Sequence, residues 1–397
     1  MNEKTTILPQ ESEILNQAQS NKRLYRDAAL TLMGSSDLES LLGAAASIRD
    51  RTKGHTISYS RKIFIPLTHL CRDYCGYCTF RKDPSEGESP YLTPDEVLEI
   101  AEAGRRAGCK EALFTLGDQP ERIFPEARSF LRHHGFERTL DYLAAMSELV
   151  LEKTGLLPHS NPGLMDAADM VRLKESNVSL GLMLENLSSR LLRPGGAHWK
   201  APDKVPARRM RTIELAGQLK IPFTTGILIG IGETIEERID SLLAIRDLHD
   251  RYGHIQEVLV QPFRAKTGTR METAPEPGSD DLQRTLAVAR LIFGEEMNLQ
   301  TPPNLTPKDY PRLLKTGIND WGGISPVTRD FVNPEAAWPE IPILAANVAA
   351  AGFILRERLA VYPEFAFRPG FIHARVKPYM ERLAGADGYA RSANLEC

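Results

Sequence analysis

The chain has 397 residues, of which 42% are hydrophobic and 25% charged, and its formal net charge is −3. This composition is ordinary for a globular protein, and the small net charge favours neither a nucleic-acid partner nor an anionic membrane. The N-terminus lacks a basic segment followed by an apolar core, so we expect no secretory signal. The chain contains no run of about 18 apolar residues, so we expect no membrane span. Free thiols fit a reducing cytoplasm, which is the location we expect.

Strands and helices are expected to alternate along most of the chain. An N-terminal helical region over residues 10–52 comes first, and a last helix is expected over 341–359. Capping boxes predict the starts of two helices between them, at Thr93 and at Thr234. The strands are expected at 61–68, 112–116, 156–160, 178–184, 223–229 and 255–260, with weaker ones near 299 and 317–319.

These spacings exclude simple hairpins and predict parallel β-α-β units, the building blocks of an α/β fold. A run of about six to eight such units predicts a TIM-like barrel, complete or partial, with its active site at the carboxyl ends of the strands. We therefore expect a helical extension over 1–57, a barrel over 58–330, and a C-terminal helix and tail over 331–397 that packs on the barrel.

Three of the five cysteines lie within eight residues, directly after the first expected strand, at Cys71, Cys75 and Cys78. The other two, Cys109 and Cys397, have no cysteine neighbour. Thiolates this close can bind one metal centre, and three of them leave one iron of a 4Fe-4S cluster open to a small molecule. The spacing therefore predicts the first three cysteines as iron ligands and the other two as bystanders.

Other interpretations of the cysteines are weighed against the cluster. A disulfide framework is disfavoured by the odd number of cysteines in a chain of this length. A structural zinc site would need a fourth ligand, which His69 could provide, but no second CxxC motif is present. The cysteines could also be buried apolar residues. Zinc is the main alternative.

The CxxxCxxC spacing, with Tyr77 before the third cysteine, resembles the signature of the radical S-adenosylmethionine (radical SAM) superfamily. The resemblance implies one 4Fe-4S cluster held by three cysteines and S-adenosylmethionine (SAM) as cosubstrate, which yields a 5'-deoxyadenosyl radical. It also implies an electron donor such as ferredoxin or flavodoxin. The aromatic residue before the third cysteine belongs to the cofactor site in this resemblance, but the signature is silent about the substrate.

Residues after the second and fourth expected strands match elements that bind SAM in this superfamily. Gly117 and Asp118 correspond to an element that accepts a hydrogen bond from the methionine ammonium, although Asp replaces the commoner Glu. Glu185 corresponds to a carboxylate that binds the ribose hydroxyls, and Arg209 to an arginine that binds the methionine carboxylate. A helix-capping turn at Asp118 and a solvated helix face at Arg209 are the alternatives.

A glycine pattern follows the fifth expected strand, in the run GILIGIGE. It resembles the GxIxGxxE element of the superfamily, whose backbone contacts adenine, and this implies a cofactor role for Gly230 and Ile231. Glycine allows the backbone to approach a flat ring closely. The spacing is not that of a dinucleotide-binding GxGxxG fingerprint.

The stretch 317–339, GINDWGGISPVTRDFVNPEAAWP, is the most informative about the substrate. It has no helical or strand period, so it is either a surface loop or a lid in which Asn319 and Asp320 bind a ring and Trp321 offers a flat face. With FIPLTHLCRDYCGYCTF, LFTLGDQPE, LPHSNPG and LVQPFRAK, it resembles the deazaflavin-forming family, FO synthase subunit 1, over residues 38–360.

That resemblance implies an ammonia-releasing lyase of deazaflavin (coenzyme F420) biosynthesis. Its substrate would be 5-amino-5-(4-hydroxybenzyl)-6-(D-ribitylimino)-5,6-dihydrouracil, supplied by a sister subunit, and its product 7,8-didemethyl-8-hydroxy-5-deazariboflavin (FO). Asp320, His159 and Tyr59 are the candidates for catalytic proton transfer. The alternatives are the sister activity, which joins tyrosine to the pyrimidine, a menaquinone-pathway radical SAM enzyme, and a non-catalytic zinc or electron-transfer protein.

Overall fold

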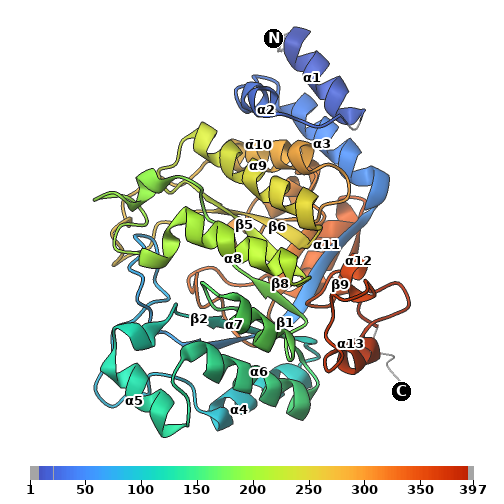
Figure 1. Cartoon of the computed structure of the whole chain (residues 1–397). Coiled ribbons are helices and arrows are strands. Elements are labelled where there is room, and N and C mark those ends of the chain that lie inside the picture. The colour runs from blue at the N-terminus through green and yellow to red at the C-terminus, as the bar shows by residue number, and fades with distance from the viewer. Residues whose placement is uncertain (1–8, 21, 392–397) are drawn as a thin grey trace.

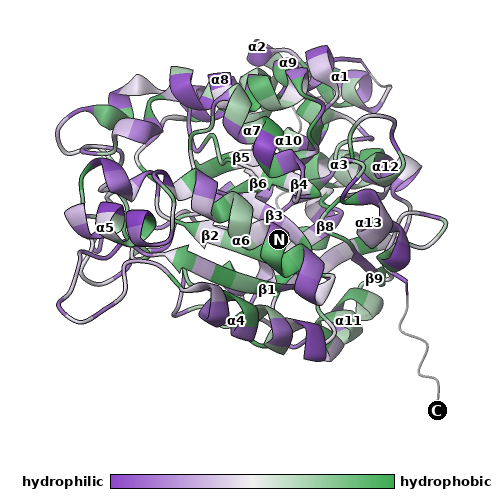
Figure 2. Cartoon of the chain, turned by 60° about the horizontal axis from the view of Figure 1, so that its bottom comes forward, coloured by the Kyte–Doolittle hydropathy of each residue, from purple (hydrophilic) through white to green (hydrophobic). Residues whose placement is uncertain are grey.

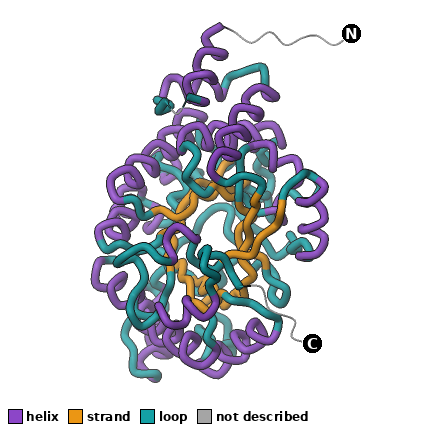
Figure 3. The backbone as a smooth tube through the Cα atoms, turned by 90° about the vertical axis from the view of Figure 1, so that its right-hand side faces the viewer, coloured by secondary structure: helices purple, strands orange, loops and turns teal. Residues whose placement is uncertain are grey.

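Across residues 9–20 and 22–391, which the computed structural model describes, eight parallel strands close into a barrel in the order β1 to β8, and β8 pairs back with β1. Figure 3 shows the ring of strands surrounded by helices. The predicted α/β barrel is confirmed, and it is complete. The barrel strands are β1 (Thr56–Thr68), β2 (Glu111–Leu116), β3 (Leu157–Asn161), β4 (Ser179–Gly181), β5 (Phe223–Ile229), β6 (Ile255–Pro262), β7 (Leu299–Gln300) and β8 (Asp320–Ile324).

Strand β1 organises the sheet because it pairs with three other strands. Its second half, from Lys62, runs beside β2, and its first half runs beside β8 and a ninth strand, β9 (Ile354–Arg358). Nearly all its residues are buried, as expected for a parallel strand covered on both faces. The cysteine loop follows directly from its carboxyl end.

Helices cover the outside of the barrel, and Figure 2 shows their hydrophilic residues lying away from the greener strands. The capping boxes expected at Thr93 and Thr234 are both present and fix the starts of α4 and α9. The helices around the barrel are α4 (Pro94–Arg106), α5 (Pro125–His133), α6 (Thr139–Thr154), α7 (Ala167–Lys174), α8 (Pro206–Gln218), α9 (Ile235–Tyr252) and α10 (Ser279–Phe293).

The N-terminal helices α1 (Pro9–Gln19), α2 (Arg26–Met33) and α3 (Leu38–Thr52) lie at one end of the molecule in Figure 1. One face of α3 is buried, including Leu41, Leu42 and Ile48. The C-terminal part contains α11 (Ile341–Ala350), α12 (Pro363–Ala366) and α13 (Lys377–Leu383). No helix of the described ranges is long and apolar enough to cross a membrane.

The helix predicted over 341–359 was too long. It ends at Ala350, Gly352 turns the chain at a φ of +86°, and the following residues form β9. This strand pairs with the open edge of the first half of β1, which satisfies its backbone groups. The division at 57 and 330 stays a prediction, although β9 shows that the C-terminal segment adds a strand to the sheet.

The final barrel strand also differs from the prediction. Residues 317–319 were expected to form it, whereas β8 begins at Asp320 and contains Trp321 and both following glycines. The Asp-Trp-Gly-Gly run is therefore part of the barrel wall, and a lid could only begin after Ile324.

Candidate active site

The cysteine loop lies at the carboxyl end of β1, and its three cysteines have free, partly exposed side chains. Cys71 Sγ accepts hydrogen bonds from the backbone amides of Asp73 (3.4 Å) and Asp118 (3.2 Å). A Cβ on Gly117 would lie 1.9 Å from the carbonyl oxygen of Leu70. Gly117 therefore lets the end of β2 contact the cysteine loop, which is a structural reason for a glycine there.

The chemistry of these thiols fits a cationic metal centre. Burial raises the pKa of Cys71 to about 12, and the nearby carboxylate of Asp73 adds to the rise. Burial likewise raises the pKa of Cys75, with smaller contributions from Cys78 and Cys71. A bound metal ion deprotonates a coordinating thiol outright. Three neighbouring thiols, one of them with two amide donors already aimed at its sulfur, suit the predicted 4Fe-4S cluster.

Three buried carboxylates lie beside the cysteine loop, with ligand oxygens within 4.8 Å of one another: Asp73, Asp118 and Asp203. Arg72 pairs with Asp203. Asp118 Oδ2 accepts a hydrogen bond from the backbone of Leu164 (3.1 Å), whereas its buried Oδ1 has no partner among the described residues. Burial, together with the charges of Asp203 and Asp73, raises the pKa of Asp118 well above its usual range. A cationic group such as the methionine ammonium would satisfy this oxygen.

Arg209 is buried rather than part of a solvated helix face. Its Nε donates to the carbonyl of Met183 (2.7 Å) and its Nη1 to the carbonyl of Asp203 (3.3 Å). Its Nη2 makes no hydrogen bond with any described residue, so the anchored guanidinium keeps donors for a carboxylate ligand.

Glu185 and Tyr77 both line the main cavity. Glu185 has a φ of +65°, an uncommon conformation for a non-glycine residue, and its carboxylate pairs with Lys204 Nζ at 2.6 Å. The Tyr77 hydroxyl lies 3.2 Å from His198 Nε2. Lys204 and His198 were not predicted, because neither belongs to a motif.

The turn at Gly230 and Ile231 is closed by a carboxylate. Both backbone amides donate to Glu233, at 2.9 Å each. Gly230 has a φ of +87°, which favours glycine, and Ile231 packs in a small apolar cluster with Leu228. An adenine contact from this turn would thus use carbonyl oxygens or the Ile231 side chain, because neither amide is free.

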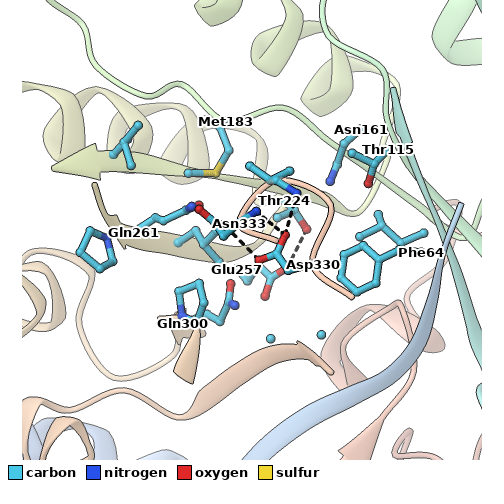
Figure 4. Close-up of a pocket in the computed structure, with 18 of the residues that line it drawn as sticks. Phe64, Thr115, Asn161, Met183, Thr224, Glu257, Gln261, Gln300, Asp330 and Asn333 are labelled. Carbon is cyan, nitrogen blue, oxygen red and sulfur yellow. Dashed lines mark hydrogen bonds between the residues drawn. The ribbon is translucent and has the colours of Figure 1, made fainter. Parts of the chain in front are cut away.

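A cavity of about 310 Å³ fills the barrel below the cysteine loop, with Tyr77 and Glu185 in its wall. Figure 4 shows polar side chains from several strands pointing into it. Part of the wall is apolar and contains Phe64, Trp338 and Phe263. Phe64 and Trp338 stack there with ring centroids 5.3 Å apart. Much of the polar lining comes from strands: Lys62, Thr115, His159, Asn161, Thr224, Glu257, Gln261, Gln300 and Arg358. The loops after β6 and β8 add Arg264, Lys266, Asp330 and Asn333.

His159 lies in this lining, as expected for a residue of the site. Its Nδ1 lies 2.6 Å from Ser179 Oγ and its Nε2 3.0 Å from Asn161 Oδ1, so both ring nitrogens are engaged. Burial lowers its pKa to about 4, against the opposing charge of Glu111. The geometry makes His159 a neutral support for Asn161, while its predicted catalytic role stays a prediction.

The other two candidates for proton transfer lie outside the cavity lining. Tyr59 is on the opposite face of β1 from Lys62 and Phe64, which line the cavity, because side chains alternate along a strand. Asp320 is fully buried and accepts hydrogen bonds from Arg358 Nε (2.7 Å) and Ser58. Neither position supports direct contact with a substrate.

The expectation that Trp321 offers a flat face to a ring was wrong. This side chain is fully buried in the core and meets Tyr310 edge-on at 5.4 Å. Trp338, from the end of the same stretch, is the tryptophan that lines the cavity. Trp321 lies in β8, a strand that begins later than the sequence predicted. The alternation of side chains along this strand directs Trp321 away from the cavity.

Lys62, Glu257 and Arg358 were missed by the sequence analysis although they lie in the cavity wall. Lys62 and Glu257 are charged residues inside otherwise apolar strand segments, and this is a signal that could have identified them. Arg358 was assigned to the helix that proved to be too long.

Residues 65–245 match the family model described as the radical SAM superfamily. The fold agrees with solved structures of low sequence identity: the [FeFe]-hydrogenase maturase HydG superposes with a TM-score of 0.73 at 16% identity, covering 94% of this chain and 81% of that one. The barrel, the cysteine loop and the match to the family model together define a radical SAM enzyme, which uses a 4Fe-4S cluster on Cys71, Cys75 and Cys78 together with SAM.

The chain is 51% identical to the 7,8-didemethyl-8-hydroxy-5-deazariboflavin synthase of Methanopyrus kandleri, over 84% of this chain and 100% of that protein. It is 49% identical to the FO synthase of Streptomyces avermitilis over 92% of this chain, but it spans only 44% of that longer protein. The chain belongs to the 7,8-didemethyl-8-hydroxy-5-deazariboflavin synthase family.

Proposed function

We propose that this chain forms FO from 5-amino-5-(4-hydroxybenzyl)-6-(D-ribitylimino)-5,6-dihydrouracil and releases ammonia. The observation that carries the proposal is the continuous cavity from the residues expected to bind SAM, Tyr77 and Glu185, to a polar region inside the barrel. Its mixed lining suits a substrate that joins a phenol to a polar heterocycle. The 51% identity to a relative of that name supports the same reaction.

When bound, the cluster and SAM would supply a 5'-deoxyadenosyl radical able to take a hydrogen atom from the substrate. The protein's own contribution is to hold the substrate so that only one hydrogen atom is in reach and the phenol faces the pyrimidine. The stacked pair of Phe64 and Trp338 is the proposed wall for the phenol ring, because aromatic rings pack well on such faces.

Asp118, Arg209 and Glu185 are the proposed SAM ligands. Asp118 has an unpartnered buried oxygen for the ammonium, Arg209 a free Nη2 for the carboxylate, and Glu185 a carboxylate already oriented by Lys204 for the ribose hydroxyls. Tyr77 and the turn at Gly230 and Ile231 complete the proposed cofactor wall.

The proposal extends to partners. The FO synthases from Streptomyces and Mycobacterium are about twice as long as the segment that this chain matches, since it spans 44% and 47% of them. A sister activity that supplies the substrate, and a ferredoxin or flavodoxin as electron donor, are the proposed partners. A reducing cytoplasm is the proposed location because the three thiols must stay reduced.

The test is anaerobic reconstitution with iron and sulfide, followed by incubation with SAM, a reductant and the substrate. We expect fluorescent FO and 5'-deoxyadenosine in equal amounts. A parallel incubation with tyrosine and the ribitylaminouracil precursor tests the sister activity. If that pair is consumed and the coupled substrate is not, the assignment of the reaction is wrong.

A further inference from the structure

The inner end of the cavity is a polar floor built from residues of four strands. Its members are Lys62 of β1, Glu257 of β6, Gln300 of β7 and Arg358 of β9, all buried. We use the name barrel floor for these four residues. They come from parts of the chain almost 300 residues apart, which β1 and its pairing with β9 bring together.

The charges of the barrel floor are already compensated by the protein. Lys62 Nζ pairs with Glu111 at 2.8 Å, and Arg358 pairs with Asp320 at 2.7 Å and with Glu257 at 3.2 Å. Two cations thus face three carboxylates. An anionic ligand such as a phosphate would find a net negative surrounding, so the barrel floor suits a neutral polar ligand.

The barrel floor nevertheless keeps unused hydrogen-bonding capacity. The side-chain amide of Gln300 makes no hydrogen bond with any described residue, although Gln300 is only 5% exposed. Among the described residues, Lys62 Nζ pairs only with Glu111, so some of its ammonium protons remain free to donate hydrogen bonds. Buried polar groups are normally satisfied, so these donors and the amide oxygen indicate a ligand rich in hydroxyl groups.

Two glycines of β8 make this arrangement possible. A Cβ at Gly322 would lie 1.8 Å from Gln300 Nε2, and a Cβ at Gly323 would lie 1.6 Å from Lys62 Cε. Both side chains therefore lie against β8 in space that any larger residue would occupy. The Trp-Gly-Gly run thus shapes the site through its missing side chains.

We propose that the barrel floor is the subsite for an unphosphorylated polyhydroxyl chain, with Gln300 and Lys62 as its specificity-determining hydrogen-bonding residues. This rests on the proposed function, in which the substrate carries a ribityl chain. The chain lies on the barrel floor, and the phenol end lies in the apolar part near Phe64 and Trp338.

The test compares two substrates, the ribityl compound and an analogue in which a methyl group replaces the chain, on the reconstituted enzyme. Gln300→Leu is expected to lower kcat/KM about tenfold for the ribityl substrate and to leave that of the methyl analogue unchanged, because one hydrogen bond is lost. Gln261→Leu, at a cavity glutamine nearer the end of β6, is the matched control and should lower both values by the same factor.

Equal losses with both substrates in Gln300→Leu, or no loss with either, would overturn the subsite. If Gln300→Leu melts well below the wild type, Gln300→Met carries the same prediction, since it keeps the length and removes only the amide. A wild-type enzyme that converts neither substrate refutes the proposed function instead. Adding a terminal phosphate to the ribityl chain is expected to lower kcat/KM in the wild type, and tighter binding of that compound would contradict a floor without net positive charge.

Discussion

The two ends of the cavity are built in different ways. At the cysteine loop, the cluster ligands and most of the proposed SAM ligands come from short segments that directly follow β1, β2 and β4: Cys71 to Cys78, Asp118 and Glu185. At the barrel floor, Lys62, Glu257 and Gln300 are single residues inside strands. Functional residues in a loop lie close together in the sequence and form a recognisable motif. Functional residues inside a barrel are far apart in the sequence, and only the fold brings them together.

Substitution of the cysteines should have the largest effect on the cysteine-loop end. Single alanine substitutions of Cys71, Cys75 or Cys78 are expected to abolish the cluster's visible absorbance, because three thiolates are needed to hold it. Cys109→Ala is the control: this thiol is buried directly before β2, outside the cysteine loop, and the absorbance should be kept. Cys397, which lies outside the described residues, carries the same expectation. A colourless Cys109→Ala protein would contradict the ligand assignment.

Asp320→Ala is expected to weaken the whole protein rather than one activity. The substitution leaves Arg358 in the interior with one carboxylate partner fewer, and breaking a buried ion pair costs about 3–5 kcal/mol of the free energy of unfolding. Urea unfolding measures this loss. Ser58→Ala, which removes an uncharged partner of the same carboxylate, should cost only about 1 kcal/mol. If Asp320→Ala stayed as stable as wild type yet made no FO, Asp320 would act on the substrate after all.

Glu185→Ala tests the cofactor wall separately from the barrel floor. The loss of a charge-assisted hydrogen bond to the ribose should weaken SAM binding by about 1.5–3 kcal/mol, which is about 10- to 150-fold in Kd. Calorimetric titration with SAM gives the value. Glu233→Ala is the comparison variant, because its carboxylate contacts only protein groups. It shows how much SAM binding weakens when a carboxylate that does not touch SAM is removed from the nearby turn. An unchanged Kd in Glu185→Ala would exclude the ribose role.

The pH dependence of stability tests the buried state of His159. Its pKa is lowered from 6.5 to about 4, so between these values the unfolded chain binds a proton that the folded chain does not. Stability should therefore fall as the pH falls through this range. From pH 7.5 to pH 5 the contribution is about 2 kcal/mol. His159→Gln should lose that part of the dependence; His254, with a similar shift, is present in both proteins and cancels. Parallel curves for the two proteins would place a charged imidazole in the cavity.

The comparison of the two ends also explains which features the sequence reveals. The approximate positions of the first seven barrel strands, the capping boxes and the cysteine loop follow from local patterns, and the structure agrees with them. The burial of Trp321, the strand β9 and the role of Arg358 depend on which edge of β1 is left open, and that is a long-range property. The same holds for Lys204, which lies in the segment before α8 and pairs with Glu185, a residue that follows β4.

The central claim is that radical formation and substrate placement occupy separate ends of one cavity. The most direct measurement is the ratio of FO to 5'-deoxyadenosine formed by Lys62→Met and by Glu185→Ala, with saturating substrate and subsaturating SAM. We expect Lys62→Met to release 5'-deoxyadenosine but to form little FO, so that the ratio falls. Glu185→Ala should form less of both products, with their ratio unchanged. A Lys62→Met protein that folds and loses both products in parallel would contradict the central claim.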